Sequence, residues 1–254
     1  LKGDPALFHT VREEVLGRRW TETTSDGSTI ERAGEFLFFT LEKGFASDRF
    51  NPFSSLDPER HTMTQLCQII LSSLDLNHGA GYGRSYYTAR SRQALQLALK
   101  HVVESRGRAV TFKNLEEALS SKVAIRDPHA RREAFQLLAT IQALIEYPQL
   151  HTTADLEREH PEHVIHMPRV LERRQVVYFW LPTIQESISV REVGQLALYA
   201  LLSAAIDRQR AGHDVRQSYL VIDEFQSIAS AGFKPILQQA RQFGVAAILA
   251  NQTP

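Results

Sequence analysis

Three short apolar runs near the carboxyl end of the chain give the strongest structural signal in the sequence. They lie at residues 175–181 (QVVYFWL), 219–222 (YLVI) and 245–250 (VAAILA). Runs of this length without polar alternation are typical of strands that are buried on both faces of a parallel sheet. Helical stretches separate them, so the order strand, helix, strand, helix, strand predicts a doubly wound α/β sheet.

The sequence marks the ends of the first of the two helices between these strands more clearly than those of the second. The first begins with the capping-box pattern Ser189 to Glu192 and is followed by Gly212, a common C-terminal stop. Its segment 196–206 is nearly apolar all round, which predicts a helix enclosed between the sheet and a neighbouring element. The second helix is expected around residues 235–243.

The amino-terminal part of the chain predicts one helix and one strand. Asp4 and Pro5 suit the N-cap and the first helical position, and a single apolar stripe predicts a helix that ends near Arg18. Residues 21–31 are polar and contain Gly and Ser, so we expect a loop there. The apolar run at 35–41 (EFLFFTL) predicts a strand.

The middle of the chain predicts an all-α region without strands. Helical periodicity and capping residues place helices at 57–76, 85–105, 111–121 and 127–146.

A histidine-rich, polar stretch at 151–168 follows these helices. His160, His163 and His166 are candidate metal ligands, but Pro161 breaks the helix that would align them, so solvated histidines are favoured.

Composition describes an ordinary folded protein of one or two domains. The 254 residues are 43% hydrophobic and 23% charged, and 29 basic residues balance 29 acidic ones, which excludes a global affinity for polyanions. The single Cys67 excludes an internal disulfide, and its apolar neighbours indicate a packing role. No apolar run approaches the ~20 residues of a membrane span. The chain starts without Met, and we expect it to be a piece of a longer protein.

Polar residues follow two of the predicted strands at the point where each strand ends. Asp223 and Glu224 follow the run 219–222, and Asn251 and Gln252 follow the next run. The carboxyl ends of parallel strands meet at one edge of a sheet, where ligands bind. A carboxylate there can hold a hydrated Mg²⁺ ion, an arrangement that serves nucleotide hydrolysis. The alternative is that the acidic pair only caps the turn after a core strand.

The segment DEFQSIASAGFKPILQQARQFGVAAILANQT resembles the Walker B to sensor region of type IV coupling proteins, the TraG/TraD branch of the HerA/FtsK-like ATPases. Further matches lie in both outer parts of the chain. The matching elements are Lys2-Gly3-Asp4, Phe50-Asn51-Pro52, Leu181-Pro182, Ser189-x-Arg191-Glu192, Asp223-Glu224-Phe225, Arg241-Gln242-Phe243-Gly244-Val245 and Asn251-Gln252.

This resemblance implies a RecA-like parallel sheet flanked by helices, built from residues 1–54 and 169–254, with an all-α domain of residues 55–168 inserted into it. It implies an ATP-driven DNA translocase of conjugation or type IV secretion that uses ATP and Mg²⁺. Its partners would be DNA in single-stranded form, secretion-channel or relaxosome proteins, and further copies in a hexamer. It would be cytoplasmic, with an anchor at the bacterial inner membrane as an option in the full-length protein.

Four residues receive roles in nucleotide chemistry from the resemblance. Asp223 would carry the metal, Glu224 would be the catalytic base, and Gln252 would sense the γ-phosphate. Arg241 would face the nucleotide of the next subunit, although a surface arginine without such a role is the alternative.

No G-x-x-x-x-G-K-S/T phosphate-binding loop occurs in the sequence. Backbone N–H groups and the lysine of that loop supply much of the affinity for the phosphates. We therefore expect the 254 residues alone to lack ATP hydrolysis, while the full-length protein would be an ATPase.

The predicted helical insert offers one candidate DNA contact. Its segment RSYYTARSR combines arginines for phosphate with tyrosines for base stacking. The alternatives are a helix with a solvated basic face, or an insert that recognises an accessory protein. The candidate residues are Arg84, Tyr86, Tyr87, Arg90 and Arg92.

Two other classes of function stay open on the sequence alone. One is a related P-loop ATPase that processes DNA or defends against mobile elements. The other is an interaction module without nucleotide, which the intact Asp223-Glu224 pair disfavours because buried carboxylates without a partner are costly.

Overall fold

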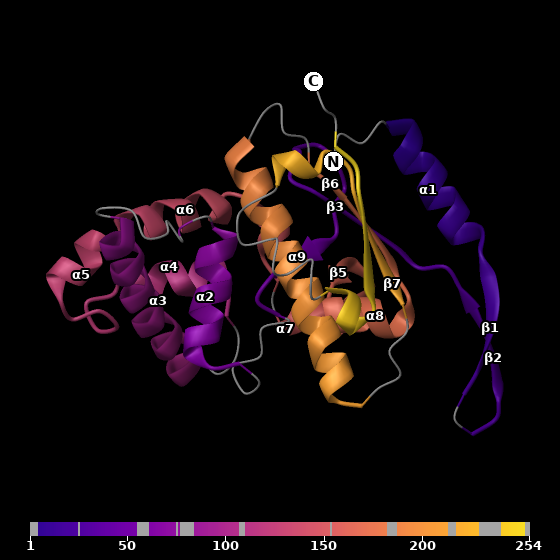
Figure 1. Ribbon diagram of the computed structural model, residues 1–254, viewed down its shortest axis with the longest axis horizontal. Coiled ribbons are helices and arrows are strands. Elements are labelled where there is room, and N and C mark those ends of the chain that lie inside the picture. The colour runs from indigo at the N-terminus through magenta and orange to yellow at the C-terminus, as the bar shows by residue number, and fades with distance from the viewer. Residues whose placement is uncertain are drawn as a thin grey trace.

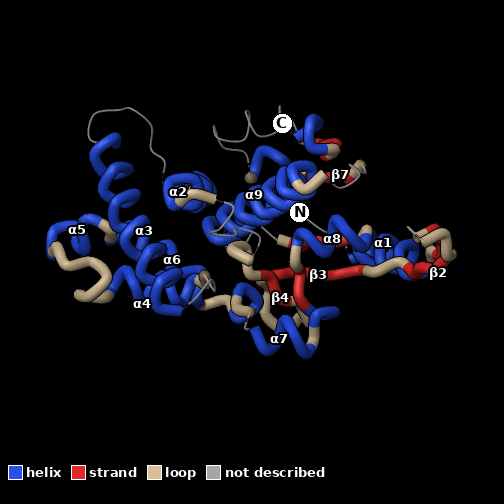
Figure 2. The backbone as a smooth tube through the Cα atoms, turned by 90° about the horizontal axis from the view of Figure 1, so that it is seen from below, coloured by secondary structure: helices blue, strands red, loops and turns tan. Residues whose placement is uncertain are grey.

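The computed structural model describes residues 5–24, 26–54, 61–74, 76, 84–106, 110–152, 154–181, 187–212, 217–228 and 240–251. A long central helix separates a lobe of helices from the strands, and a β-hairpin lies at the far edge (Figure 1). Figure 2 shows the same order from below, with the helical lobe at one end and the hairpin at the other.

The described residues form helices and strands in the following order. The α-helices are α1 (Pro5–Gly17), α2 (Met63–Ser73), α3 (Arg84–Arg106), α4 (Phe112–Ser120), α5 (Pro128–Glu133), α6 (Phe135–Ile145), α7 (Ala154–Glu159), α8 (Met167–Arg173) and α9 (Ser187–Arg210). The strands are β1 (Arg19–Thr23), β2 (Thr29–Ala33), β3 (Phe36–Thr40), β4 (Arg49–Phe50), β5 (Val164–Ile165), β6 (Val176–Trp180), β7 (Ser218–Ile222) and β8 (Val245–Leu249). The 3₁₀ helices are η1 (Pro148–Leu150), η2 (Pro161–His163), η3 (Phe225–Ser227) and η4 (Arg241–Phe243).

The strands pair in twos, and three of the four pairs are parallel. β3 pairs with β6, β4 with β5, and β7 with β8, while β1 and β2 form an antiparallel hairpin. The predicted continuous sheet is therefore not formed within the described part of the chain, where β6 joins β3 and not β7. Aromatic packing stabilises the observed pairing, since the rings of Phe39 and Phe179 lie 5.2 Å apart across the β3–β6 pair.

The prediction that the carboxyl-terminal strands are buried on both faces is wrong for β6, β7 and β8: no residue of β6 is fully buried, and Val245 alone is buried in β8. Along β7, exposed and half-buried positions alternate, and Tyr219 and Val221 remain 67% and 69% exposed. The opposite face packs on α9, where Ile222 meets Leu198. An apolar run without polar alternation does not distinguish a strand covered on one face from a strand covered on both.

The helices α2 to α6 form the predicted helical lobe. Phe112 of α4 is fully buried and meets Phe53 edge to face, with ring centroids 4.7 Å apart. Cys67 of α2 is also fully buried, and this burial raises the pKa of its thiol to about 12, against the opposing charge of Arg92. A buried thiol with so high a pKa is a packing residue, as the sequence predicts.

Three sequence expectations differ from the structure in detail. The expected loop at 21–31 is part of the β1–β2 hairpin, whose turn holds Gly27 at a φ of 83°. The helix expected over 127–146 is interrupted at Ala134, which separates α5 from α6. The polar stretch 151–168 contains the strand β5 besides short helices. Hairpin strands with polar residues on both faces give no periodic signal, which explains why the first was missed.

The strands β4 and β5 mark where the chain leaves for the helical lobe and where it returns. They pair in parallel, with Arg49 opposite Val164. Directly after β4, the buried Asn51 donates its side-chain N–H to the carbonyl oxygen of Val110 (3.0 Å) and accepts the N–H of Phe53 (3.1 Å). The Phe50-Asn51-Pro52 element thus connects strand and lobe, and the domain boundaries inferred from it stay a prediction.

None of the helices in the described ranges has the length and apolar character that crossing a bilayer requires.

Candidate functional site

The acidic pair lies at the carboxyl end of β7, as predicted. Asp223 is exposed, while Glu224 is only 5% exposed. The backbone of Glu224 is left-handed, with a φ of 52° and a ψ of 46°, and its N–H donates to Oδ1 of Asp223 (2.9 Å). The turn therefore sends one carboxylate to the surface and the other into the protein.

Hydrogen bonds join the ends of β7 and β8 beyond the last strand residues. The N–H of Ala250 donates to the carbonyl oxygen of Ile222 (2.9 Å), and the N–H of Phe225 donates to the carbonyl oxygen of Ala250 (3.0 Å). These two bonds are made by Ile222 and Phe225, the residues on either side of the acidic pair. The structure thus brings the acids beside the end of β8, where Asn251 is exposed.

Helix α9 supports the turn that carries the acidic pair. The buried Gln195 donates its side-chain N–H to the carbonyl oxygen of Ile228 (3.1 Å). A Cβ atom at Gly194 would lie 3.1 Å from a methyl carbon of Ile228, so the Ile228 side chain would have to shift by a few tenths of an ångström to accept it. The absence of a side chain at Gly194 is what permits this close approach.

The remaining predicted nucleotide residues are placed only in part. Arg241 is exposed and begins η4, where its carbonyl oxygen accepts the N–H of Gly244 (3.2 Å). Gln252 and most of the helix expected at 235–243 lie outside the described residues. Their roles stay predictions.

The candidate DNA residues lie on α3, where two of the arginines have partners within the chain. Arg90 forms an ion pair with Glu133 of α5 (3.2 Å), and Arg92 donates to the side-chain oxygen of Gln68 on α2 (3.1 Å). The side chains of Arg84, Tyr86 and Tyr87 lie outside the described part. These contacts give Arg90 and Arg92 a structural role inside the lobe, and their contact with DNA stays a prediction.

The three histidines do not converge. Nδ1 of His160 lies 3.3 Å from Glu162, and Nδ1 of His163 lies 3.2 Å from Asp48. His166 precedes α8, where burial first, and the neighbouring Arg169 second, lower the pKa of its imidazole. No group of three or more potential metal ligands is found among the residues that the structure describes.

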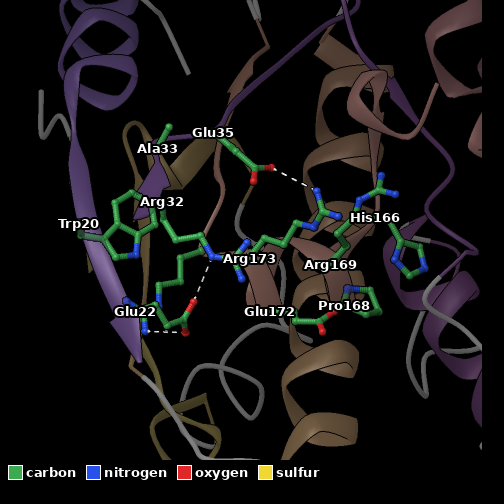
Figure 3. A pocket seen from close by; sticks show the side chains of 11 residues that line it. Trp20, Glu22, Arg32, Ala33, Glu35, His166, Pro168, Arg169, Glu172 and Arg173 are labelled. Atoms are coloured by element: carbon green, nitrogen blue, oxygen red, sulfur yellow. Dashed lines mark hydrogen bonds and ion pairs between the residues drawn. The ribbon is translucent and has the colours of Figure 1, made fainter. Parts of the chain in front are cut away.

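A pocket that the sequence did not reveal lies between the β1–β2 hairpin and α8 (Figure 3). Its lining contains four arginines, three glutamates, one histidine and one indole. The residues that matter most are Trp20, Glu22, Arg32, Arg169, Arg173 and Arg174. Because the two walls are more than 130 residues apart in the sequence, no local pattern could have found it.

Comparison with known proteins finds likeness at the level of structure alone. No protein-family model matches the chain, and no curated protein matches it either. Solved structures of the conjugative coupling protein TrwB do match. The complex of TrwB with ADP and Mg²⁺ has a TM-score of 0.53 and 12% identity, and the match covers 87% of this chain and 57% of TrwB.

Two further TrwB structures give the same result. The unbound TrwBΔN70 has a TM-score of 0.54 and 11% identity over 86% of this chain and 56% of its own. The complex with the GTP analogue GDPNP has a TM-score of 0.54 and 11% identity over 87% and 57%. The chain therefore spans somewhat more than half the length of TrwB, and the resemblance to coupling proteins is confirmed at the level of fold: this chain is structurally similar to the type IV coupling protein TrwB over most of its length.

Proposed function

We propose that this chain forms part of the RecA-like motor of an ATP-driven coupling ATPase, which moves DNA in conjugation or type IV secretion. The observation that carries the proposal is the parallel pairing of β7 with β8, which brings the acidic pair beside the end of the neighbouring strand. Ligands of parallel α/β sheets bind at such strand ends. TrwB, which shares the fold, has been solved with ADP and Mg²⁺ and with GDPNP.

The residues at the end of β7 fit a hydrated Mg²⁺ ion with nucleotide. Asp223 presents an exposed carboxylate, which suits a cation that keeps most of its water ligands. When bound, the ion would offset negative charge on the phosphates. In this proposal Asp223 holds the ion, and the enclosed Glu224 accepts a proton from the attacking water. The hydrogen bond from Gln195 of α9 to Ile228 helps to hold the turn in place.

The other parts of the proposal rest on the resemblance and on the fold of TrwB. Gln252 would respond to the γ-phosphate, and Arg241, which is exposed, is free to face a neighbouring subunit in a hexamer. The partners would be single-stranded DNA and secretion-channel or relaxosome proteins. The protein would work in the cytoplasm, with an inner-membrane anchor as an option.

The test compares Glu224→Gln with Glu31→Gln in the full-length protein. Glu31 lies exposed in β2, so its variant matches the charge change without touching the site. We expect Glu224→Gln to lower DNA-stimulated ATP hydrolysis by a factor of about 10² or more, because a general base contributes 10²–10⁴-fold. Nucleotide affinity should stay close to that of the unmodified protein, and Glu31→Gln should hydrolyse ATP at the normal rate.

The 254-residue chain serves as a second sample in the same assay. It has no G-x-x-x-x-G-K-S/T loop, so we expect no ATP turnover from it. Normal hydrolysis by the Glu224→Gln protein would contradict the role of Glu224. Hydrolysis by the 254 residues alone would contradict the proposed need for a separate phosphate-binding loop.

A further inference from the structure

The pocket between the hairpin and α8 is separate from the strand ends of the proposed nucleotide site. Its volume is about 390 Å³, which lies in the range of small-ligand pockets. Trp20 and Arg32 line one wall from the hairpin, and Arg169 and Arg173 line the other from α8 (Figure 3). Ligand-binding groups therefore face the cavity from two independent elements.

Four arginines line the pocket against three carboxylates, those of Glu22, Glu35 and Glu172, so arginine donors outnumber the carboxylate oxygens that could accept from them. Glu22 is shared, because one of its oxygens lies 3.3 Å from Arg32 and the other lies 3.3 Å from Arg174. Arg173 forms a long ion pair with Glu35 (3.9 Å), and this carboxylate also accepts a side-chain N–H of Gln175. Each guanidinium has five N–H donors, so these carboxylates satisfy only some of them.

Two buried donors in the lining have no hydrogen-bond partner within the described structure. They are Nε1 of Trp20 and Nε of Arg169. Arg169 uses another nitrogen, Nη2, to bind the carbonyl oxygens of Pro161 and Val164, which fixes its side chain against the end of the pocket. A buried donor without a partner is costly, and an acceptor in the cavity would remove that cost.

Repulsion between cations points in the same direction. Arg169 and Arg173 lie four positions apart on α8 and therefore share one face of the helix. Burial first, and the charge of Arg173 second, lower the pKa of Arg169, while the charges of Glu157, Glu35 and Glu162 oppose this shift without cancelling it. The next residue, Arg174, is the C-cap of α8 and places a third guanidinium at the end of the same helix. Its backbone is left-handed, with a φ of 59°, a conformation in which glycine is usual.

We propose that this pocket binds a phosphoryl oxyanion, held by Arg32, Arg173 and the indole N–H of Trp20. Donors from opposite walls require a ligand that accepts hydrogen bonds in several directions. The tetrahedral oxygens of a phosphoryl group do so, whereas a carboxylate accepts in one plane. Arginine forks match phosphate oxygens in pairs. The phosphoryl group comes either from free phosphate or from a nucleic-acid backbone, and the site does not depend on the proposed ATPase activity.

Calorimetric titration of the 254-residue chain tests this proposal with three probes: inorganic phosphate, acetate and a short oligothymidylate. Arg173→Gln is the informative variant, because Arg173 is 58% exposed and its ion pair is long, so its loss should leave the fold intact. Arg158→Gln is the matched control, since Arg158 is exposed on α7 outside the pocket and removes the same charge. Trp20→Phe removes the indole donor and keeps an aromatic ring.

We expect saturable phosphate binding that weakens about tenfold in Arg173→Gln, as for the loss of a charge-assisted hydrogen bond, and about threefold in Trp20→Phe. Arg158→Gln should bind like the unmodified chain, and acetate should bind more weakly than phosphate. Thermal unfolding checks that each variant is folded, and a variant that is not folded is replaced by Arg32→Gln.

Comparing inorganic phosphate with oligothymidylate distinguishes the two sources of the phosphoryl group. Binding of oligothymidylate alone, with the same dependence on Arg173, would support the proposal and assign the ligand to a nucleic-acid backbone. The proposal is overturned if neither probe binds, if acetate binds as tightly as phosphate, or if Arg158→Gln weakens binding as much as Arg173→Gln. The pocket would then be an ion-pair network that only holds the hairpin to α8.

Discussion

Two residues other than glycine have a left-handed backbone in the described part of the chain, and each stands at one of the two candidate sites. Glu224 ends β7 at the proposed nucleotide site, and Arg174 ends α8 beside the arginine-lined pocket. Non-glycine residues in this conformation cost of order 1 kcal/mol or more and persist where surrounding contacts hold them. The backbone of Glu224 is held by its N–H bond to Oδ1 of Asp223 and by the bonds that its neighbours Ile222 and Phe225 make to Ala250, and Arg174 is held by its ion pair with Glu22.

His166 makes the stability of the protein depend on pH. Burial lowers the pKa of its imidazole, the charge of Arg169 acts in the same direction, and Glu157 opposes both. In the unfolded chain the His166 imidazole has a pKa near 6.5, whereas in the folded protein it is protonated only at lower pH. Stability is therefore full above about pH 6.5 and falls as the pH drops toward the folded pKa, by at most about 1.4 kcal/mol per pH unit.

We expect His166→Gln to flatten this slope between pH 7 and 5, measured by urea unfolding at each pH. His9→Gln, which removes an exposed imidazole from α1, is the control and should keep the slope. An unchanged slope in His166→Gln would show that other groups set the pH dependence.

At the scale of single elements, periodicity predicted which segments are helical better than where they begin. Helix α2 was expected from residue 57 but begins at Met63, after a capping box made by Thr62 and Gln65. The N–H of Gln65 donates to Oγ1 of Thr62 (3.3 Å), and the N–H of Thr62 donates to the side chain of Gln65 (2.9 Å). Residues 57–60 lie outside the described part.

Thr62→Ala should lower the free energy of unfolding by about 1 kcal/mol, because it removes this cap. Thr64→Ala, two positions along at an exposed site, should be neutral or slightly stabilising because alanine favours helix. Chemical denaturation of the two variants makes the comparison. Equal losses would mean that the cap contributes nothing beyond the side chain itself.

Four of the strands were predictable as apolar runs, but of their pairings only that of β7 with β8 was expected. The runs that became β3, β6, β7 and β8 were all identified from the sequence, and the parallel direction of β7 and β8 was expected. The pairing of β6 with β3 depends on aromatic contacts across 140 residues of sequence, such as Phe36 with Tyr178. The acidic pair could be found because it is local, whereas the arginine-lined pocket is assembled by tertiary contacts.

One large core extends from the helical lobe to the β3–β6 strands, and a smaller cluster of Leu198, Ile222 and Ile228 joins α9 to β7. Buried side chains of α2 and α4 belong to the same cluster as Phe39 of β3 and Leu196 of α9. In Figure 1, α9 lies between the helical lobe and β7, and α2 packs on it. We therefore expect the lobe and the strands to unfold together.

The variant Phe112→Ala tests this coupling. Phe112 is fully buried in the lobe, so its truncation should lower stability by about 3–5 kcal/mol. Both tryptophans lie outside the lobe, Trp20 in β1 and Trp180 in β6, so their fluorescence reports on the strands. The unfolding transition seen by fluorescence should shift with that seen by circular dichroism. Phe135→Ala, at an exposed position, is the control, and a fluorescence transition that stays in place would show independent units.

The exposed face of the β7–β8 pair has a consequence for self-association of the protein at high concentration. Tyr219, Val221 and Ile248 are exposed apolar side chains on a two-stranded ribbon that pairs with no third strand among the described residues. Such a ribbon is a template for self-association. Low protein concentration and a mild detergent should prevent this self-association. The substitution Val221→Lys should reduce it without changing the face of β7 that packs on α9.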